Sequence, residues 1–389
     1  MLFRTPALDE KETEVVARIE DLKRSLRYAV AEHPRRWQGL LRRSTLGRNI
    51  QGSNSIEGYN VTVEDAIAAA EGEQPLDADA AAWAAVTGYR AAMTYVLQLA
   101  DDPHFHYSTD LLRGLHFMML QHDLDRNPGK WRPGPVFVRD DERNEVGYEG
   151  PDATRVPELM DELVAVLEGE GATPALVRAA MAHLNLVMIH PYSDGNGRMA
   201  RCLQTLVLAR TGVLAPPFSS IEEYLGRNTR DYYDVLALVG GGAWHPERDA
   251  RPWIRFCLTA HYRQAHTLLR RTRELERLWG TLEAEVAKAR LPERAVFALA
   301  DAAVGFQVRN NTYRTAAEIS DQLASRDLKG LVDAGLLVPR GERRGRYYVA
   351  APRVLEFRRA SAEDKRIADP FAEPTAMPML PGLLDENGA

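Results

Sequence analysis

Apolar residues recur every three or four positions through most of this chain, and that spacing is the strongest constraint on its fold. Val15, Ile19, Leu22 and Leu26 form one such stripe. Similar stripes run through 78–100, 108–122, 155–168, 175–189, 198–211 and 253–287. Because this is the period of an α-helix with one buried face, the sequence predicts a mainly α-helical fold.

Length and composition indicate a multidomain globular protein. A chain of 389 residues exceeds an ordinary single domain, so we expect two or three domains. The apolar fraction of 45% and charged fraction of 27% suffice for a large buried core. The net charge of −6 provides no overall attraction to nucleic acid, so such binding needs a local basic patch. Cys202 and Cys257 each stand alone in a helical pattern, which indicates core thiols.

Neither a secretory signal nor a membrane span is predicted. The first residues, MLFRTPALDEKETEVV, lack the apolar core of a signal peptide. No apolar stretch in the sequence approaches the roughly 20 residues that cross a bilayer. We therefore expect a cytoplasmic protein with no membrane partner.

The stretch His-Pro-Tyr-Ser-Asp-Gly-Asn-Gly-Arg-Met-Ala-Arg at 190–201 lies between two apolar helical segments. Pro191 ends the first helix, because the αR conformation is disfavoured before proline. Gly195 and Gly197 open the second helix, where free N–H groups and the helix dipole attract anions. Glycines also let the backbone approach phosphate oxygens without a side-chain clash. The layout predicts a polyphosphate site.

The side chains of this stretch suit nucleotide chemistry. Arg198 and Arg201 are three residues apart, so they share one helix face and can reach neighbouring phosphates. Asp194 is a hard anionic ligand for a Mg²⁺ ion that also binds phosphate oxygens. His190 can accept a proton from an attacking hydroxyl, because imidazole titrates near neutral pH. Each residue alone has an ordinary structural explanation, but their convergence favours a reaction centre.

The stretch resembles the Fic motif, His-Pro-Phe-x-Asp-Gly-Asn-Gly-Arg-x-x-Arg, with Tyr192 in place of Phe. The resemblance implies a Fic-type helical bundle with His190 as general base and Asp194 as ligand of Mg²⁺ or Mn²⁺. It also implies that ATP phosphates contact Gly195, Asn196, Gly197, Arg198 and Arg201. A branch of the family that acts as a kinase carries a bulky basic residue at the position of Gly195, so the glycine favours AMP transfer.

An upstream segment resembles the inhibitory pattern of the same family, Ser/Thr-x-x-x-Glu-Gly/Asn. It reads Ser-Asn-Ser-Ile-Glu-Gly at 53–58. The resemblance implies that Glu57 ends a helix and pairs with Arg201. The carboxylate would then replace the ATP γ-phosphate and leave ATP in a pose unfit for in-line attack. The alternative is an ordinary helix end with an exposed Glu57 and Gly58 as its C′ residue.

A short hairpin precedes the motif. The sequence predicts two strands at 136–138 and 146–148, separated by a charged run. The resemblance, which includes Gly-Lys-Trp-Arg at 129–132, implies a flap whose edge at Val136, Phe137 and Val138 docks a target segment. The charged run at 140–145 is longer than we expect of such flaps, and it leaves target preference open.

A downstream helix resembles the family's segment beside the nucleotide base. The resemblance implies an adenine pocket formed by Asn228, Tyr232 and Tyr233. Aromatic faces and an amide suit stacking and base-edge contacts. The alternative is that both tyrosines pack beneath the core.

Residues 291–352 are predicted to form a winged helix-turn-helix domain. Helices are expected at 295–305, 314–323 and 324–337, followed by two strands around a basic turn. The basic residues of this unit are Arg326, Lys329, Arg340, Arg343, Arg344 and Arg346. Contact with DNA phosphates is one use of such a patch, and protein docking or dimerisation is another.

Together these patterns predict residues 1–100 as an N-terminal helical region and 101–245 as a Fic catalytic core. Linking helices at 246–290 and the winged helix would follow, and the Pro-rich end at 361–389 is expected to be a flexible tail. The predicted function is autoinhibited transfer of AMP from ATP to a Ser, Thr or Tyr hydroxyl of a protein, including the chain itself. Two alternatives stay open: a de-AMPylase that uses Glu57, and a nucleotide-sensing DNA-binding regulator. A homodimer is compatible with each.

Overall fold

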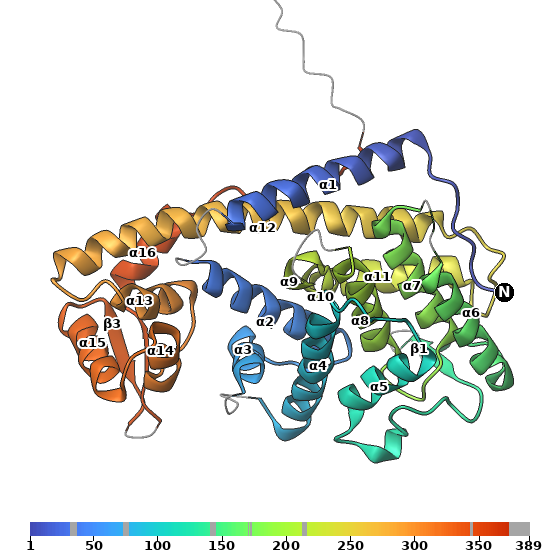
Figure 1. The fold of residues 1–389 in the computed structure, drawn as a ribbon, viewed down its shortest axis with the longest axis horizontal. Coiled ribbons are helices and arrows are strands. Elements are labelled where there is room, and N and C mark those ends of the chain that lie inside the picture. The colour runs from blue at the N-terminus through green and yellow to red at the C-terminus, as the bar shows by residue number, and fades with distance from the viewer. Residues whose placement is uncertain are drawn as a thin grey trace, which may run out of the picture.

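The computed structural model describes residues 1–31, 37–72, 78–140, 145–169, 171, 173–211, 216–342 and 345–372, and these residues form a mainly α-helical protein. Helix α12 (Arg251–Lys288) extends along the molecule, with α1 (Glu10–Ala31) beside it (Figure 1). A larger helical body lies below one half of α12, and a smaller C-terminal unit lies below the other (Figure 1). Its 38 residues make α12 about 57 Å long.

The N-terminal helices are α1, α2 (Gln38–Ile56), α3 (Val63–Glu71) and α4 (Ala80–Leu99). The predicted stripe on α1 is confirmed, since Val15, Ile19 and Leu26 are buried. Helix α3 begins where the side chain of Thr62 accepts a hydrogen bond from the Asp65 amide. Such a cap satisfies one of the free N–H groups of the first turn.

Helices α7 (Ala175–Ile189) and α8 (Asn196–Ala209) pack against each other in the middle of the larger body. Helix α8 is buried on nearly all sides because α2, α4, α5 and α9 also contact it. The other elements of this body are α5 (Thr109–Leu120), η1 (Leu124–Arg126), η2 (Ala153–Arg155), α6 (Val156–Glu168), α9 (Pro216–Ser219), α10 (Glu222–Arg227) and α11 (Thr229–Gly240).

The predicted hairpin is confirmed. Strands β1 (Phe137–Asp140) and β2 (Glu145–Glu149) pair antiparallel, with Phe137 opposite Glu149 and a bulge after Val138. Residues 141–144 of the predicted charged run lie outside the described residues. Glu149 also forms a bridge to Ala243, so the outer side of β2 is partly paired and β1 carries the freer edge of the hairpin.

The C-terminal unit contains α13 (Ala295–Val304), α14 (Asn310–Ala317), α15 (Asp321–Asp333) and α16 (Pro352–Ala360). Strands β3 (Leu337–Arg340) and β4 (Tyr347–Ala350) form an antiparallel pair. The predicted helix at 314–323 is wrong, because the chain turns at Glu318, where φ is 53°. Ser320 then caps α15 by accepting a hydrogen bond from the Leu323 amide, which moves the boundary between the two helices.

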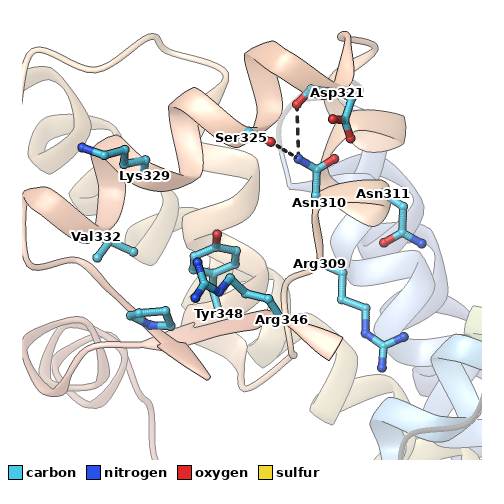
Figure 2. Close-up of a pocket in the computed structure, with 10 residues that line it drawn as sticks. Arg309, Asn310, Asn311, Asp321, Ser325, Lys329, Val332, Arg346 and Tyr348 are labelled. Carbon is cyan, nitrogen blue, oxygen red and sulfur yellow. Dashed lines mark hydrogen bonds between the residues drawn. The ribbon is translucent and has the colours of Figure 1, made fainter. Parts of the chain in front are cut away.

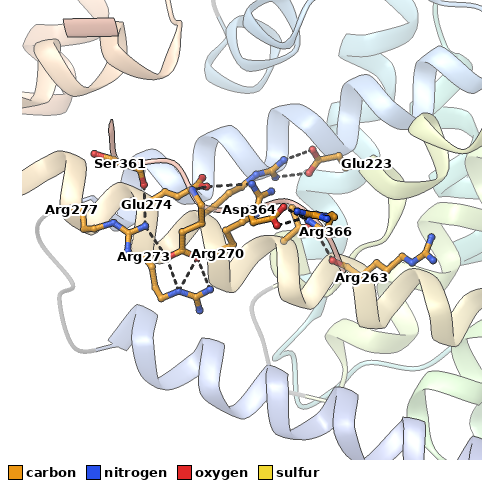
Figure 3. A network of polar contacts seen from close by, with 12 residues as sticks. Glu223, Arg263, Arg270, Arg273, Glu274, Arg277, Ser361, Asp364 and Arg366 are labelled. Carbon is orange, nitrogen blue, oxygen red and sulfur yellow. Dashed lines mark hydrogen bonds and ion pairs between the residues drawn. The ribbon is translucent and has the colours of Figure 1, made fainter. Parts of the chain in front are cut away.

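Two further predictions are corrected. The linking helices expected at 246–290 are one helix, α12. Part of the predicted flexible tail, residues 361–372, lies against this helix (Figure 3). There Glu363 contacts Arg273 and Arg277, and the guanidinium of Arg255 lies over the Phe371 ring. These ion pairs and this packing explain the order of the segment, while 373–389 lie outside the described residues.

The apolar side chains form two cores. The first core fills the larger body and includes both buried cysteines, as predicted. The second core joins the C-terminal unit to parts of α2, α3 and α12. Within the described ranges, no helix combines the length and apolar content that crossing a bilayer requires.

Candidate active site

The loop between α7 and α8 has the turns that the sequence predicts. His190 ends α7 with a left-handed backbone, φ 51°, and Gly195 precedes α8 with φ 76°. The left-handed backbone at Gly195 disfavours any side chain, and a Cβ there would also lie 2.8 Å from Leu120 Cδ1. Backbone conformation and packing therefore both favour glycine at this position.

Asn196 holds this loop in shape. Its Oδ1 accepts a hydrogen bond from the Tyr192 amide, and its Nδ2 donates to the Tyr192 carbonyl, both at 2.9 Å. The side chain is buried, and these two bonds fix its position. The contact of Asn196 with ATP phosphates stays a prediction.

His116 is a residue of the site that the sequence did not reveal. Its Nε2 donates to the Asp194 carbonyl at 2.9 Å, and its Nδ1 accepts from the Gly129 amide at 2.8 Å. Burial lowers the pKa of His116 to about 4, so the ring is neutral at physiological pH. His116 lies among the buried apolar residues of α5, so its position in the sequence is that of an ordinary core residue.

His190 is oriented as a proton acceptor. Its Nδ1 donates a hydrogen bond to the Val187 carbonyl at 3.0 Å, which leaves the lone pair on Nε2. Burial lowers the pKa of the imidazole below its ordinary value, and the Arg132 charge adds to this effect. The ring is thus neutral and ready to accept a proton at neutral pH.

Arg132, in the predicted Gly-x-x-Arg segment, ties the base of the flap to the loop. Its Nε donates to the His190 carbonyl at 2.8 Å, and its backbone amide donates to the Pro191 carbonyl at 2.9 Å. The other guanidinium nitrogens donate to the carbonyls of Gly134 and Pro151. One buried side chain therefore connects both ends of the flap to the loop at His190.

Arg201 lies one turn into α8 and contacts the end of α2. Its Nε donates to Ser53 Oγ at 2.8 Å, and its Nη2 donates to the Ser53 carbonyl at 2.9 Å and to Glu57 Oε1 at 2.7 Å. The predicted ion pair between Glu57 and Arg201 is present. Burial opposes the charged guanidinium, but the Glu57 carboxylate and two nearby tyrosines outweigh it and raise the pKa of Arg201.

The carboxylate of Glu57 lies against the start of α8. A Cβ placed on Gly197 would be only 2.5 Å from Glu57 Oε1. The side chain of Glu57 is 23% exposed, so it is not the free surface glutamate of the alternative interpretation. A negative group thus occupies the helix end at which the sequence predicts phosphate.

Arg198 has the unsatisfied donors expected of an anion site. The side chain is buried, and among the described residues its Nε and Nη1 have no hydrogen-bond partner. Nη1 of Arg201 is also unpaired within that set. Because buried donors are normally satisfied, these atoms fit phosphate oxygens. Asp194 lies 3.8 Å from Arg198 Nη2 and is partly exposed.

A metal ion here would depend on the nucleotide. No group of three His, Cys, Asp or Glu side chains converges anywhere in the described part of the chain. Asp194 can supply one carboxylate oxygen, since its Oδ1 is bonded to the Gly195 amide and Oδ2 is partly free. The remaining ligands would come from phosphate and water, which is how Mg²⁺ is usually bound beside nucleotides.

Residues 106–208 match the model of the Fic/DOC family. This segment is similar to Fic domains. Two curated relatives are similar: a protein adenylyltransferase Fic from Aedes aegypti, 31% identical over 49% of this chain and 35% of the relative, and one from Nematostella vectensis, 30% identical over 54% and 45%. The chain thus spans less than half the length of these relatives.

Solved structures show the same fold. A Fic family protein from Desulfovibrio desulfuricans aligns over 90% of this chain and 98% of its own, with a TM-score of 0.59 and 23% identity. Fic-1 from Caenorhabditis elegans aligns over 66% of this chain and 72% of its own, with a TM-score of 0.52 and 21% identity. The larger body is therefore a helical Fic-type fold.

The predicted adenine pocket needs revision. Tyr232 is 1% exposed, and its hydroxyl bonds to His183 Nε2 at 2.9 Å inside the Fic domain core. It therefore cannot offer a ring face to a base, as the alternative interpretation anticipated. Tyr233 is 45% exposed, and its hydroxyl donates to the Ile56 carbonyl at 3.3 Å. Asn228 Nδ2 donates to the Tyr224 carbonyl.

The flap of the Fic domain is anchored on one side and open on the other. The Tyr148 hydroxyl donates to the Met188 carbonyl at 2.7 Å, which ties β2 to α7 next to His190. Phe137 on β1 is 50% exposed, whereas Val136 and Val138 are partly buried. The edge predicted for target docking is thus present beside the Fic motif.

A second candidate site is a pocket of about 700 Å³ in the C-terminal unit, outside the Fic domain (Figure 2). Predicted residues Lys329 and Arg346 line it, together with Arg309, which the sequence did not reveal. Arg326 and Arg340 are exposed elsewhere, and Arg343 and Arg344 lie outside the described residues. Asn310 Nδ2 donates to Ser325 Oγ at 2.8 Å and stiffens the wall of the pocket.

Proposed function

We propose that the chain transfers AMP from ATP to a hydroxyl group of a protein and that Glu57 restrains this activity. The observation that carries the proposal is the ion pair of 2.7 Å between Glu57 and Arg201. It lies at the start of α8, where Nε and Nη1 of buried Arg198 have no hydrogen-bond partner among the described residues. The printed names of the similar relatives, protein adenylyltransferases, support the same reaction.

In the proposed reaction, the amides at Gly195 and Gly197 and the guanidinium of Arg198 bind the ATP phosphates. His190 Nε2 takes the proton from the protein hydroxyl while the hydroxyl oxygen attacks the α-phosphorus in line. The bond from the α-phosphorus to the bridging oxygen breaks, and pyrophosphate leaves. Mg²⁺ or Mn²⁺ bound with ATP at Asp194 would neutralise phosphate charge. Positioning and charge neutralisation are the main catalytic contributions.

The proposed restraint is electrostatic and steric. Arg201 has one carboxylate partner at 2.7 Å, and a distal phosphate would need the same guanidinium. With Glu57 in place, the phosphates cannot occupy the position that aligns the α-phosphorus with the nucleophile. Removal of the carboxylate makes Arg201 available to the nucleotide, including its Nη1, which has no hydrogen-bond partner in the described part of the chain.

We assign substrate contacts on both sides of the loop. The free edge of β1, with exposed Phe137, is proposed to bind an extended segment of the target by backbone hydrogen bonds. Tyr233 and Asn228 are proposed to lie beside the adenine, while Tyr232 supports them from the core. Modification of the chain by itself is included in this proposal.

The test is incorporation of label from ATP carrying ³²P at its α-phosphate, with Mg²⁺ or Mn²⁺, into the chain and into a cell lysate. Wild type, Glu57→Gly and a Glu57→Gly, His190→Ala double variant are compared. We expect weak labelling by wild type, strong labelling by Glu57→Gly and no labelling by the double variant. A silent Glu57→Gly protein that melts normally would refute the transferase proposal.

A second candidate, removal of AMP from a modified protein, is favoured by the partial exposure of the Glu57 carboxylate near the loop. That group could orient a water molecule toward the AMP phosphorus. The experiment follows release of labelled AMP from lysate proteins that the Glu57→Gly variant has modified. Release by wild type, with none by Glu57→Gln, would support removal.

A third candidate concerns the C-terminal unit, in which we infer that α13, α14, α15 and the β3–β4 hairpin form a winged helix. Three cationic side chains, Arg309, Lys329 and Arg346, line its pocket, and they fit DNA phosphates. Retention of duplex DNA should fall steeply as salt increases, and an Arg309→Ala, Arg346→Ala protein should lose it. Equal retention by this variant would argue against a nucleotide-sensing DNA-binding regulator.

A further inference from the structure

Helix α2, which is followed directly by its C-cap residue Glu57, belongs to both hydrophobic cores. At its start, Trp37, Leu40 and Leu41 are buried in the second core with residues of α13. At its end, Ile50 and Ile56 are buried in the first core with the Fic domain. Figure 1 shows α2 between the C-terminal unit and the larger body. One helix therefore joins the packing of the two parts.

An ion pair ties the first half of α2 to the C-terminal unit. Arg43 Nη2 donates to Asp301 Oδ1 in the middle of α13 at 2.7 Å. The Asp301 side chain is largely buried, so the pair is shielded from water and from salt. Loss of either partner would remove this tie between the two helices, which disfavours their present placement.

The second half of α2 is fitted closely to the active site. A Cβ on Gly52 would lie 2.5 Å from the Glu222 carbonyl, so the backbones of α2 and α10 touch here. One residue later, Ser53 bonds to Arg201 through its hydroxyl and its carbonyl. Little room exists for α2 to shift while Glu57 keeps its contact.

A helix of 19 residues is a stiff rod of about 28 Å. A tilt of about 5° at the α13 end moves the other end of such a rod by about 2.5 Å. That displacement is enough to break an ion pair of 2.7 Å between Glu57 and Arg201. Movement at the C-terminal unit can thus reach the active site through α2, whose end contacts Arg201.

We propose that the C-terminal unit holds the restraint in place, and that α2 transmits any movement of α13 to Glu57. The proposal rests on the proposed role of Glu57. It follows that weakening the contact between α2 and α13 should release Arg201, although the altered residues lie far along the helix from the loop at 190–196. A ligand of the C-terminal unit would act by the same route.

The experiment compares Arg43→Ala and Leu40→Ala with a matched control, Arg353→Ala. The control removes an ion pair of 2.6 Å with Glu285 that joins α16 to α12 and does not involve α2. The first readout is hydrogen exchange of the backbone amides at 53–58 in the full chain. We expect several-fold faster exchange in Arg43→Ala and Leu40→Ala, unchanged exchange in the control, and partial restoration in Arg43→Lys.

The second readout is self-labelling with α-labelled ATP in two backgrounds. With Glu57 present, Arg43→Ala should raise labelling several-fold; with Glu57→Gly, it should add nothing. Unchanged exchange at 53–58 in both test variants would overturn the proposal whether or not the chain is a transferase. Equal gains of labelling in both backgrounds would also overturn it. A silent Glu57→Gly protein with faster exchange in Arg43→Ala would instead refute the transferase and retain the coupling.

Discussion

The rings of His116 and Tyr192 stack almost parallel, with centroids 3.6 Å apart and an angle of 6° between their planes. Tyr192 stands where the Fic motif usually has Phe, and among the described residues its buried hydroxyl has no hydrogen-bond partner. The stack therefore depends on the ring alone. His116 in turn forms hydrogen bonds with the carbonyl of Asp194 and the amide of Gly129, so the two stacked rings stabilise the loop between α7 and α8.

Tyr192→Phe should stabilise the protein. The substitution keeps the stack with His116 and removes a buried hydroxyl whose desolvation is not compensated, which is worth about 1 kcal/mol. Urea unfolding followed by fluorescence measures the change in the free energy of unfolding. Tyr148→Phe is the control, because its hydroxyl is bonded to the Met188 carbonyl and its loss should destabilise. A loss of stability in Tyr192→Phe would mean that its hydroxyl is bonded in solution.

The labelling reaction of the Glu57→Gly variant should depend on pH only at the acid end. Burial lowers the pKa of His190 below its ordinary value, so the imidazole accepts protons at all pH values well above that point. Activity should rise with pH to a midpoint below about 6.5 and then stay level through pH 8. Initial rates between pH 5 and 8 test this. A midpoint above 7 would contradict the assignment of His190 as the buried base.

Gly197→Ala should displace the Glu57 carboxylate. The new Cβ would lie 2.5 Å from Glu57 Oε1 and 3.0 Å from Arg201 Nη1. In wild type we expect a loss of about 1–3 kcal/mol in the free energy of unfolding, and in Glu57→Gly a clearly smaller loss. Thermal melting of the four proteins in a double-mutant cycle measures this coupling. Equal losses in both backgrounds would show that Glu57 does not contact Gly197.

Glu222→Gln should change how stability depends on pH. Burial raises the pKa of Glu222 to about 7, although Tyr89 and other partners oppose the shift. The folded-state pKa of Glu222 exceeds its unfolded-state pKa. The contribution of this carboxyl group to the free energy of unfolding is therefore fully present below the unfolded-state pKa and is lost as pH rises through 7. Between these values the difference between wild type and Glu222→Gln should change by up to about 1.4 kcal/mol per pH unit. Parallel stability curves from pH 4 to 8 would contradict it.

The sequence was sufficient to predict the features that depend on residues close together along the chain. The period of apolar residues predicted the helices of the Fic domain, and Pro191 and Gly195 marked the loop between α7 and α8. The motif at 190–201 and the segment at 53–58 both resemble patterns of the Fic family. That resemblance also predicted the contact between Glu57 and Arg201. Turn and helix preferences act over a few neighbouring residues, so they can be recognised in a single sequence.

Other features were decided only by the tertiary structure. His116 could not be separated from a core residue, because its role depends on carbonyl and amide groups from distant segments. Tyr232 is buried, while Tyr233 next to it is exposed, and that difference depends on how α11 is rotated against the core. Segment 361–372 lacks helical periodicity, yet partners on α12 hold it in place. The division of α2 between two cores is likewise a consequence of packing, since burial reflects the sum of all neighbours in space.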